Sequence, residues 1–435
     1  MKSLKGRCAK MIKIYEYGSV KNEEIFSRVD VKTGVEDVVA DIIYNVRKNG
    51  DKALFEYEER FDKAKLSSLI VSETEIDEAF SLVDKRLIEV IKKAAENIRS
   101  FHEKQVRTNF MINDRPGVVM GQKVLPIEKA GLYVPGGTAA YPSTVLMDSI
   151  PAKIAGCSEI AMVTPPNSNG KINPVILAAA KIAGVDKIYK VGGAQAIAAL
   201  AFGTETVSRV DKIVGPGNAF VAEAKKQVFG TVAIDMIAGP SEILCVADST
   251  CNPKYVAADM LSQAEHDRLA SAVLVTDSYE FAEKVSAELE KQIPLLPRAE
   301  IARESIDKNG KIIVAKDLRL AVDIANEIAP EHLELCVDNP FDYLDGIKHA
   351  GSVFMGKNCP EALGDYFAGP NHTLPTLGTA RFSSPLSVDD FQKKTQYTYF
   401  SADALSAVAE DIACFAESEG LHAHARSVTV RFEKD

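Results

Sequence analysis

Cysteine is sparse in this chain, and its pattern argues against a disulfide-stapled extracellular protein. The seven cysteines are odd in number and widely scattered, and no two of them form a Cys-x-x-Cys pair. This usage is typical of the reducing cytoplasm. The basic residues between Lys2 and Lys13 are followed by polar and acidic residues rather than an apolar stretch, so they do not predict an export signal.

Two further absences narrow the class of protein. No uninterrupted apolar run approaches the roughly 18 residues of a membrane-spanning helix, so the sequence excludes such a span on length. The 51 basic and 61 acidic side chains give a formal net charge of −10, the wrong sign for attraction to a phosphate backbone. Nucleic acid is therefore not an expected partner. With 435 residues and 46% hydrophobic content, the chain is predicted to form at least two large folded units.

From Gly131 onward, short apolar runs closed by Gly or Pro alternate with Ala-rich helical stretches. Strands that are apolar on both faces and alternate with helices favour parallel sheets covered by helices. The predicted fold class is α/β, with two incomplete Rossmann-like doubly wound units of similar plan plus small N- and C-terminal elements. The expected strands are 131–134, 159–163, 187–191 and 212–214 in a first series, and 243–247, 272–276, 311–315, 333–337 and 351–355 in a second.

The segments outside these two series have mainly helical spacing. Apolar residues recur every three or four positions between Val35 and about Gln105, and again in a stripe from Ala404 to Phe415. Residues 427–432 alternate as a strand would. The C-terminal stripe has so little core of its own that it is expected to pack on another unit or another subunit.

Three glycine turns, at 134–137, 191–195 and 214–218, each stand between a predicted strand and a predicted helix. Helix N-termini opened by glycine offer unpaired N–H groups to an anion, so a dinucleotide can dock there. None of the turns is a Gly-x-Gly-x-x-Gly fingerprint with an acidic residue about 20 positions later. Any one turn judged alone reads more readily as a tight connection, but three at neighbouring strand ends favour a ligand site.

Gln263 and His266 lie three residues apart in Leu-Ser-Gln-Ala-Glu-His-Asp, which on a helix places the amide and the imidazole on one face. The two can share zinc or a similar divalent ion, but two ligands do not establish a site, and such a pair is more often a surface hydrogen-bonding pair. Further donors are needed. The candidates are Asp365, His372, His422 and His424, of which the last two lie on different faces of a helix.

Glu331 and His332 fall between a predicted helix and a predicted strand. An adjacent carboxylate and imidazole can act as a general-base pair near neutral pH, although a turn residue followed by a strand cap explains them equally well. Ser241 is expected to be a binding group, because no His-Asp partner follows at the spacing of a serine hydrolase. His102 and His349 lie among charged helical residues and are expected to be solvated.

Nine strings follow one another in order from Gly131 to Thr376: GLYVPGG, STVLM, GGAQAIAALAFGTE, VDKIVGPGNAFVAEAK, IDMIAGPSE, LSQAEH, APEHL, AGSVF and GDYFAGPNHTLPT. Together they resemble the histidinol dehydrogenase family, and a weaker match to Glu419 and His424 extends the resemblance to the end of the chain. It fades only in roughly the first 30 residues. The resemblance implies a homodimeric enzyme with one zinc ion per subunit that oxidises L-histidinol through the aldehyde to L-histidine with two NAD. This is the last step of histidine biosynthesis.

The resemblance also implies roles for individual residues. Glu331 and His332 would be the catalytic pair, with His332 as the base and Glu331 activating water. The zinc ligands would be Gln263, His266, Asp365 and His424, the last reaching in from the partner subunit, although His422 leaves open which imidazole binds. The substrate contacts would be Ser241, Gln263, His266, His332, Asp365, His372, Glu419 and His424, and the NAD contacts Tyr133, Gln195 and Asn218.

With these roles, four domains are expected. They are an N-terminal arm (1–30), a first α/β domain carrying the zinc and catalytic residues (31–130 with 239–385), a second α/β domain carrying the NAD contacts (131–238), and a C-terminal helical element exchanged with the partner (386–435). A related zinc- and NAD-dependent dehydrogenase of another polar alcohol is the alternative function. A metal-scaffolded binding protein is the rival from a different class. A cytoplasmic location without membrane or nucleic-acid partners is expected.

Overall fold

The computed structural model describes residues 11–28, 34–136 and 140–433, which fall into two compact units. The first unit comprises 1–105 with 128–391, and the second comprises 106–127 with 392–435. The basic N-terminal residues before position 11 lie outside the described residues. Among those described, no helix is long and apolar enough to cross a membrane.

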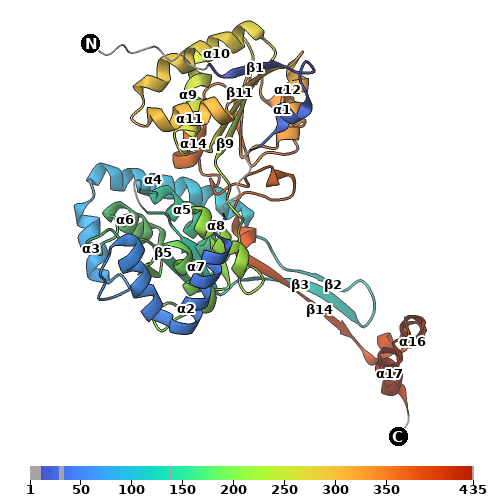
Figure 1. Ribbon diagram of the computed structural model, residues 1–435. Helices are drawn as coiled ribbons and strands as arrows, with labels where there is room; N and C mark the ends of the chain where they lie inside the picture. Colours follow the sequence, from blue (N-terminus) through green and yellow to red (C-terminus); the bar gives the residue numbers. More distant parts are fainter. Residues whose placement is uncertain (1–10, 29–33, 137–139, 434–435) are drawn as a thin grey trace, which may run out of the picture. The chain divides into compact units, whose positions relative to one another are not determined.

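The first unit is built on two all-parallel sheets (Figure 1). This confirms the expected α/β class with two doubly wound units, and every strand of both predicted series is present. The six-stranded sheet has the order β1 (Lys13–Glu16), β11 (Lys311–Val314), β10 (Ser271–Thr276), β9 (Glu242–Ala247), β12 (His332–Cys336), β13 (Ser352–Met355). The five-stranded sheet has the order β6 (Lys187–Lys190), β5 (Glu159–Thr164), β4 (Lys129–Tyr133), β7 (Lys212–Val214), β8 (Ala233–Ile234).

The six-stranded sheet is buried on both faces. Along β9, Ile243 and Cys245 point into one hydrophobic cluster, whereas Leu244 and Val246 point into another, which is why the run is apolar throughout. Side-chain caps help to start three of its helices, because the side chains of Asn252, Ser278 and Asp317 accept backbone N–H groups. The helices are α9 (Pro253–Ala264), α10 (Tyr279–Gln292), α11 (Ala299–Asn309) and α12 (Leu318–Ile328).

The N-terminal helices pack with the five-stranded sheet, which differs from the expected grouping of 31–130 with 239–385. Val39 and Val46 of α2 share one cluster with Ile197 of α7 and Val221 of α8 (Figure 1). Helical spacing identifies a buried face but not the sheet that covers it. The helices around this sheet are α2 (Glu36–Tyr57), α3 (Glu73–Leu82), α4 (Lys85–His102), α5 (Pro142–Ala155), α6 (Pro174–Ala183), α7 (Gly193–Phe202) and α8 (Ala219–Val228).

The expected N-terminal arm also belongs to a larger element. Its strand β1 pairs in parallel with β11 at the edge of the six-stranded sheet, and the short helix α1 (Asn22–Phe26) follows it. Ile25 of α1 is buried in one of the clusters on that sheet. The arm therefore extends the sheet in its described part.

The second unit holds an antiparallel sheet and three short helices. The sheet has the order β14 (Gln392–Phe400), β3 (Val118–Pro126), β2 (Phe110–Ile112), and the helices are α15 (Ala402–Ser406), α16 (Ala409–Ser418) and α17 (His422–Thr429). The predicted strand at 427–432 is wrong, because these residues complete α17 and a 3-10 turn. Their alternation covers only six residues, and the helix is stabilised instead by packing on α16, which buries Ala425.

Candidate active site

The Glu331–His332 pair lies at the amino end of a central strand. His332 is the first residue of β12 and pairs with Ile243 of β9 on one side and Ser352 of β13 on the other. The chain enters the strand from α12 through Ala329, which has a positive φ of 49°. The two residues are only 8% and 4% exposed. The strand thus holds both groups rigidly in the protein interior.

In the imidazole of His332, Nδ1 has two hydrogen-bond partners and Nε2 has none. Its Nδ1 lies 3.0 Å from the carbonyl oxygen of Glu242 and 2.8 Å from Nε2 of Gln263. The carbonyl only accepts and the amide nitrogen only donates, so these contacts favour different tautomers. A proton on Nδ1, donated to Glu242, leaves Nε2 unprotonated. Burial lowers the pKa of His332, which keeps the ring neutral.

Three carboxyl groups, those of Glu331, Glu361 and Asp365, gather around this imidazole. Nε2 of His332 has no hydrogen-bond partner and lies 3.7 Å from Oε1 of Glu361 and 3.9 Å from Oδ1 of Asp365. Oε2 of Glu331 accepts the backbone N–H of Glu242 at 2.9 Å. Burial raises the pKa of Glu331 well above its usual range, and the neighbouring carboxyls of Glu242, Glu361 and Asp365 add to the rise. The chain alone therefore gathers more carboxyl groups here than it can keep ionised.

A cavity of about 120 Å³ opens beside the pair and is lined by His332, Phe354, Asp365 and His372, among others. Asp365 lies on a π-helical turn (Gly364–Ala368), and burial followed by the charge of Glu361 raises its pKa to about 7. His372 lies with its Nδ1 3.9 Å from Oδ1 of Asp365. Burial, followed by the charge of His332, lowers the pKa of His372 to about 4. Both side chains predicted from the sequence thus reach the pocket of His332.

Gln263 and His266 lie at the C-terminal end of α9 rather than on an exposed helix face. Gln263 is fully buried, and its Oε1 has no hydrogen-bond partner, whereas its Nε2 contacts His332. His266 follows the helix and reaches solvent, although surrounding protein and the charge of His332 lower its pKa. The surface-pair interpretation therefore fails for Gln263. Ser241 is half-buried and stands directly before β9.

These donors fit a divalent cation. His332, Glu361 and Asp365 each offer one ligand atom, and the three atoms lie within 4.8 Å of one another. The unpartnered amide oxygen of Gln263 adds a buried donor that a cation would satisfy. Imidazole nitrogen with carboxylate and amide oxygen is a donor set that zinc accepts. Glu361 was not predicted from the sequence, although its spacing of four residues from Asp365 is a signal for a shared helical face.

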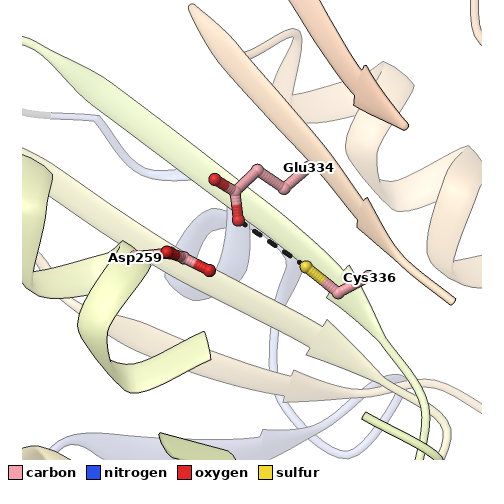
Figure 2. Close-up of side chains that lie close together, drawn as sticks. All are labelled: Asp259, Glu334 and Cys336. Carbon is pink, nitrogen blue, oxygen red and sulfur yellow. Dashed lines mark hydrogen bonds between the residues drawn. The ribbon is translucent and has the colours of Figure 1, made fainter. Parts of the chain in front are cut away.

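A second cluster of ligand-type residues lies in the core behind the pair, and its contacts are hydrogen bonds. Figure 2 shows Asp259, Glu334 and Cys336, whose ligand atoms also lie within 4.8 Å of one another. Oε2 of Glu334 accepts the thiols of Cys336 at 3.6 Å and Cys245 at 3.5 Å, and its Oε1 accepts the backbone N–H of Glu361 at 2.7 Å. Burial raises the pKa of Glu334 well above its usual range and that of Asp259 to about 6. The two thiols and the backbone N–H group satisfy the carboxyl oxygens of Glu334 without a metal.

The predicted NAD residues follow the carboxyl ends of strands in the five-stranded sheet, but one predicted phosphate turn is already occupied. Gly192 donates its N–H to Oε1 of Glu58 at 3.3 Å, and Gly193 donates to the hydroxyl of Tyr133 at 3.2 Å. Gln195 donates its Nε2 to the same Glu58 oxygen at 3.0 Å. Burial raises the pKa of Glu58 to about 8. The anion expected at this turn is thus replaced by an internal carboxyl group.

The third turn is also satisfied internally. The side chain of Asn218 caps α8 by accepting the N–H groups of Phe220 and Val221, and Gly215 donates its N–H to Asp235 at 2.8 Å. The glycine turns are therefore strand-to-helix connections, as predicted, but the N–H groups described here are already hydrogen-bonded within the protein. The first turn includes 137–139, which lie outside the described residues.

The remaining histidines and Glu419 complete the placement. His102 is fully buried with its Nδ1 2.7 Å from Oε1 of Gln105, so the expectation that it is solvated is wrong. His349 is partly buried. Glu419, His422 and His424 belong to the second unit, where Glu419 follows α16, both imidazoles lie on α17, and all three residues are exposed.

The fold and the site define an α/β enzyme with a buried acid–base pair, donors for a divalent cation and a second sheet with polar side chains at its strand ends. The family model of histidinol dehydrogenase matches residues 27–432. The chain is 55% identical to histidinol dehydrogenase of Clostridium acetobutylicum over 97% of this chain and 99% of that protein. It is 54% identical to that of Bacillus cereus over 93% and 94%.

A solved structure supports the same family. The crystal structure of histidinol dehydrogenase from Elizabethkingia anophelis matches with a TM-score of 0.93 and 41% sequence identity, covering 97% of this chain and 98% of that one. The chain belongs to the histidinol dehydrogenase family, and it is an NAD-dependent alcohol and aldehyde oxidoreductase of histidine biosynthesis.

Proposed function

We propose that this enzyme carries out a zinc-dependent, four-electron oxidation of L-histidinol through L-histidinaldehyde to L-histidine and uses two NAD in succession. The observation that carries the proposal is the unpartnered, buried Nε2 of His332, which lies within 3.9 Å of Asp365 and 3.7 Å of Glu361. A free base beside cation ligands is the arrangement that oxidation of an oriented alcohol requires.

Gln263, His266 and Asp365 would hold the metal, together with His424 from a second copy of the chain. The unpartnered Oε1 of Gln263 favours a nearby cation, and a bound cation would offset the burial and the charge of Glu361 that raise the pKa of Asp365. When bound, zinc supplies orientation by accepting the amine and imidazole nitrogens of the substrate. Ser241, His372 and Glu419 are proposed as further substrate contacts.

His332 acts as the base in both oxidations. In the first oxidation, Nε2 of His332 takes the proton of the substrate hydroxyl while a hydride passes from the carbon that carries this hydroxyl to NAD. The product of this step is the aldehyde. Glu331 then takes a proton from water as the water adds to the aldehyde. Because burial raises the pKa of Glu331, it needs nearby positive charge for this step, and the imidazolium of His332, with Nδ1 3.7 Å from Oε2 of Glu331, provides it. His332 gives its proton to the aldehyde oxygen, which completes the hydrate and returns the imidazole to its neutral form. The hydrate then loses a hydride to the second NAD and a proton to Nε2 of His332, and His332 and Glu331 finally release their protons to solvent.

Tyr133, Gln195 and Asn218 are proposed to contact NAD. They are supported by their place at the carboxyl ends of strands in the five-stranded sheet, where ligands of open α/β sheets bind. A cytoplasmic location is proposed as well, because the six cysteines that the structure describes are free thiols.

A homodimer with shared sites is proposed from the second unit. In its described part, only three hydrophobic side chains, those of Val118, Ala409 and Ala425, are buried, whereas Phe415 is 70% and Met111 63% exposed. Such a surface is expected to be covered by another subunit. The exposed His424 would then complete the metal site of that subunit.

Metal removal tests the zinc requirement. Enzyme stripped with a chelator should lose both oxidations and regain them with one equivalent of zinc per chain, and Asp365→Asn should reduce the bound zinc. Full turnover of histidinol by protein verified to be free of metal would refute the proposal.

Subunit mixing tests the shared site. His266→Ala and His424→Ala subunits, each inactive alone, should regain about a quarter of the wild-type sites after random exchange, because one hybrid site in two is intact and half of the dimers are hybrids. An absence of recovery after verified exchange would place His424 in the site of its own chain.

A further inference from the structure

Arg28 makes a set of long-range contacts that no step of the proposed reaction uses. It follows α1, and its side chain is 27% exposed. Its guanidinium group pairs with the carboxylate of Glu242 and donates to the backbone carbonyls of Ile328 and Ala329, the latter at 3.3 Å. Arg28 thus links the start of β9 to the end of α12, the two segments that flank the Glu331–His332 pair.

Glu242 holds both members of that pair through its backbone. Its N–H donates to Oε2 of Glu331 at 2.9 Å, and its carbonyl oxygen lies 3.0 Å from Nδ1 of His332. The carbonyl accepts a hydrogen bond from a protonated Nδ1, so it favours the tautomer in which Nε2 carries no proton. The amide of Gln263 favours the opposite tautomer, so a small displacement of Glu242 changes which nitrogen of His332 is the base.

The second anchor of Arg28 lies on a strained turn. Ala329 has a positive φ of 49° two residues before Glu331, a conformation that a residue with a Cβ adopts at a cost of about 1 kcal/mol or more. Hydrogen bonds to the carbonyls of Ile328 and Ala329 hold this turn in place. The orientation of the Glu331 and His332 side chains therefore depends on Glu242 and on the turn at Ala329, and Arg28 is bonded to both.

We propose that Arg28 is a positioning residue that fixes the orientation and tautomer of His332 through Glu242; this inference rests on the proposed function of the Glu331–His332 pair. Arg28 lies outside the contacts of His332 itself. A planar guanidinium binds a carboxylate and two carbonyls at once in a fixed fork geometry, whereas the three donors of lysine stand on one compact, flexibly held ammonium group. A cavity of about 140 Å³ lined by Arg28, Glu242, Ser271 and Lys311 lies beside it, with room for a small ion if the side chain is removed.

Kinetics of Arg28→Ala provide the test. A displacement of the base lowers kcat by about 10- to 100-fold, while the KM for histidinol and the zinc content stay within about threefold of wild type. Arg28→Lys should recover only part of kcat. Millimolar guanidinium should raise the kcat of Arg28→Ala several-fold and leave the wild type unchanged. An unchanged kcat in Arg28→Ala, or a loss that guanidinium does not restore, would overturn the proposal.

Arg381→Ala is the matched control. Arg381 donates to the carbonyl of Glu327 at 2.7 Å and pairs with the carboxylate of the same residue at 3.2 Å, next to Ile328, but it makes no hydrogen bond to Glu242. Its kcat should stay within about twofold of wild type. An equal loss of kcat in both variants would show that Arg28 acts only on the general stability of α12.

Nitrogen-15 NMR of His332 separates this inference from the proposed function. Wild-type enzyme should show the proton on Nδ1, and Arg28→Ala should show a mixture of tautomers. If the wild type fails to oxidise histidinol but the tautomer still changes in Arg28→Ala, the proposed function fails and the positioning role stands. An identical tautomer in both proteins would overturn the positioning role whatever the activity.

Discussion

The two parallel sheets of the first unit have similar plans but place their candidate functional side chains at opposite ends of the strands. In the five-stranded sheet, Tyr133 ends β4, and Asn218 lies beyond the carboxyl end of β7. In the six-stranded sheet, Ser241 and His332 stand at the amino ends of β9 and β12. The rule that ligands bind at carboxyl ends therefore locates the candidate residues of one sheet and misses those of the other.

The buried carboxyl groups near the two sheets also differ in their contacts. Glu361 and Asp365 lie beside the imidazole nitrogen of His332 that has no partner, and Glu331 lies beside the other ring nitrogen, an arrangement that suits proton transfer. In the five-stranded sheet, Glu58 accepts the backbone N–H of Gly192 and the amide of Gln195, so its contacts support a turn. We expect substitutions at the first group to change rates and substitutions at the second to change stability or NAD binding.

The largest expected effect is that of His332→Ala. Loss of the general base should lower kcat for both the alcohol and the aldehyde by about a thousandfold. Steady-state rates with each substrate at saturating NAD measure this. Retention of more than about a tenth of the wild-type rate with either substrate would remove His332 from the role of base for that step.

Glu331→Gln should separate the two oxidations. In the proposed mechanism Glu331 activates water only after the first hydride has left. Oxidation of supplied histidinaldehyde should therefore slow by about 100-fold, whereas the first hydride transfer should slow by less than about tenfold. Single-turnover NADH formation from each substrate distinguishes the two steps. Equal slowing of both would contradict a water-activating role.

Glu58→Gln should change stability in a pH-dependent way. The pKa of Glu58 is raised by burial from its usual 4.5 to about 8 in the folded protein, so protonation stabilises the fold below pH 4.5 and this contribution is lost as the pH rises toward 8. Glu58→Gln, which cannot ionise, should match the wild type at pH 4.5 and exceed its free energy of unfolding at pH 8 by roughly 4 kcal/mol. Urea unfolding at both pH values measures the difference. A constant offset across pH would show that Glu58 is ionised in the fold.

The smallest expected effect is that of Asn218→Ala. It should raise the KM for NAD about fivefold with little change in kcat, and loss of the α8 cap should destabilise the protein by about 1 kcal/mol. Asn218→Ser keeps a capping oxygen and should restore the stability but not the NAD affinity. If the two variants bind NAD equally well, Asn218 serves only as a cap.

The strand series and the fold class could be predicted because each buried strand is a continuous apolar run closed by a turn. Long-range packing could not be predicted. The apolar face of α2 is visible in the sequence, but its pairing with the five-stranded sheet depends on contacts between distant segments. The strand β14 carries polar and aromatic residues on a mostly exposed ladder, so hydrophobic spacing did not reveal it.

The candidate site was predicted in part for similar reasons. The spacing of Gln263 and His266 indicated a shared ligand, but the burial of Gln263 and its contact with His332 come from β12 lying beside β9. Glu361 and Arg28 lacked a motif of their own. Their roles arise from residues that the fold brings together over long separations in the chain, as between Arg28 and Glu242.

The most direct test of the central claim, that one buried pair at the amino end of β12 serves both oxidations, is the ratio of NADH formed to L-histidinol consumed. The wild-type enzyme loaded with zinc should form two NADH for each L-histidine, with no free aldehyde detectable by a trapping reagent. One NADH per histidinol with release of the aldehyde, or no NADH at all, would contradict the account.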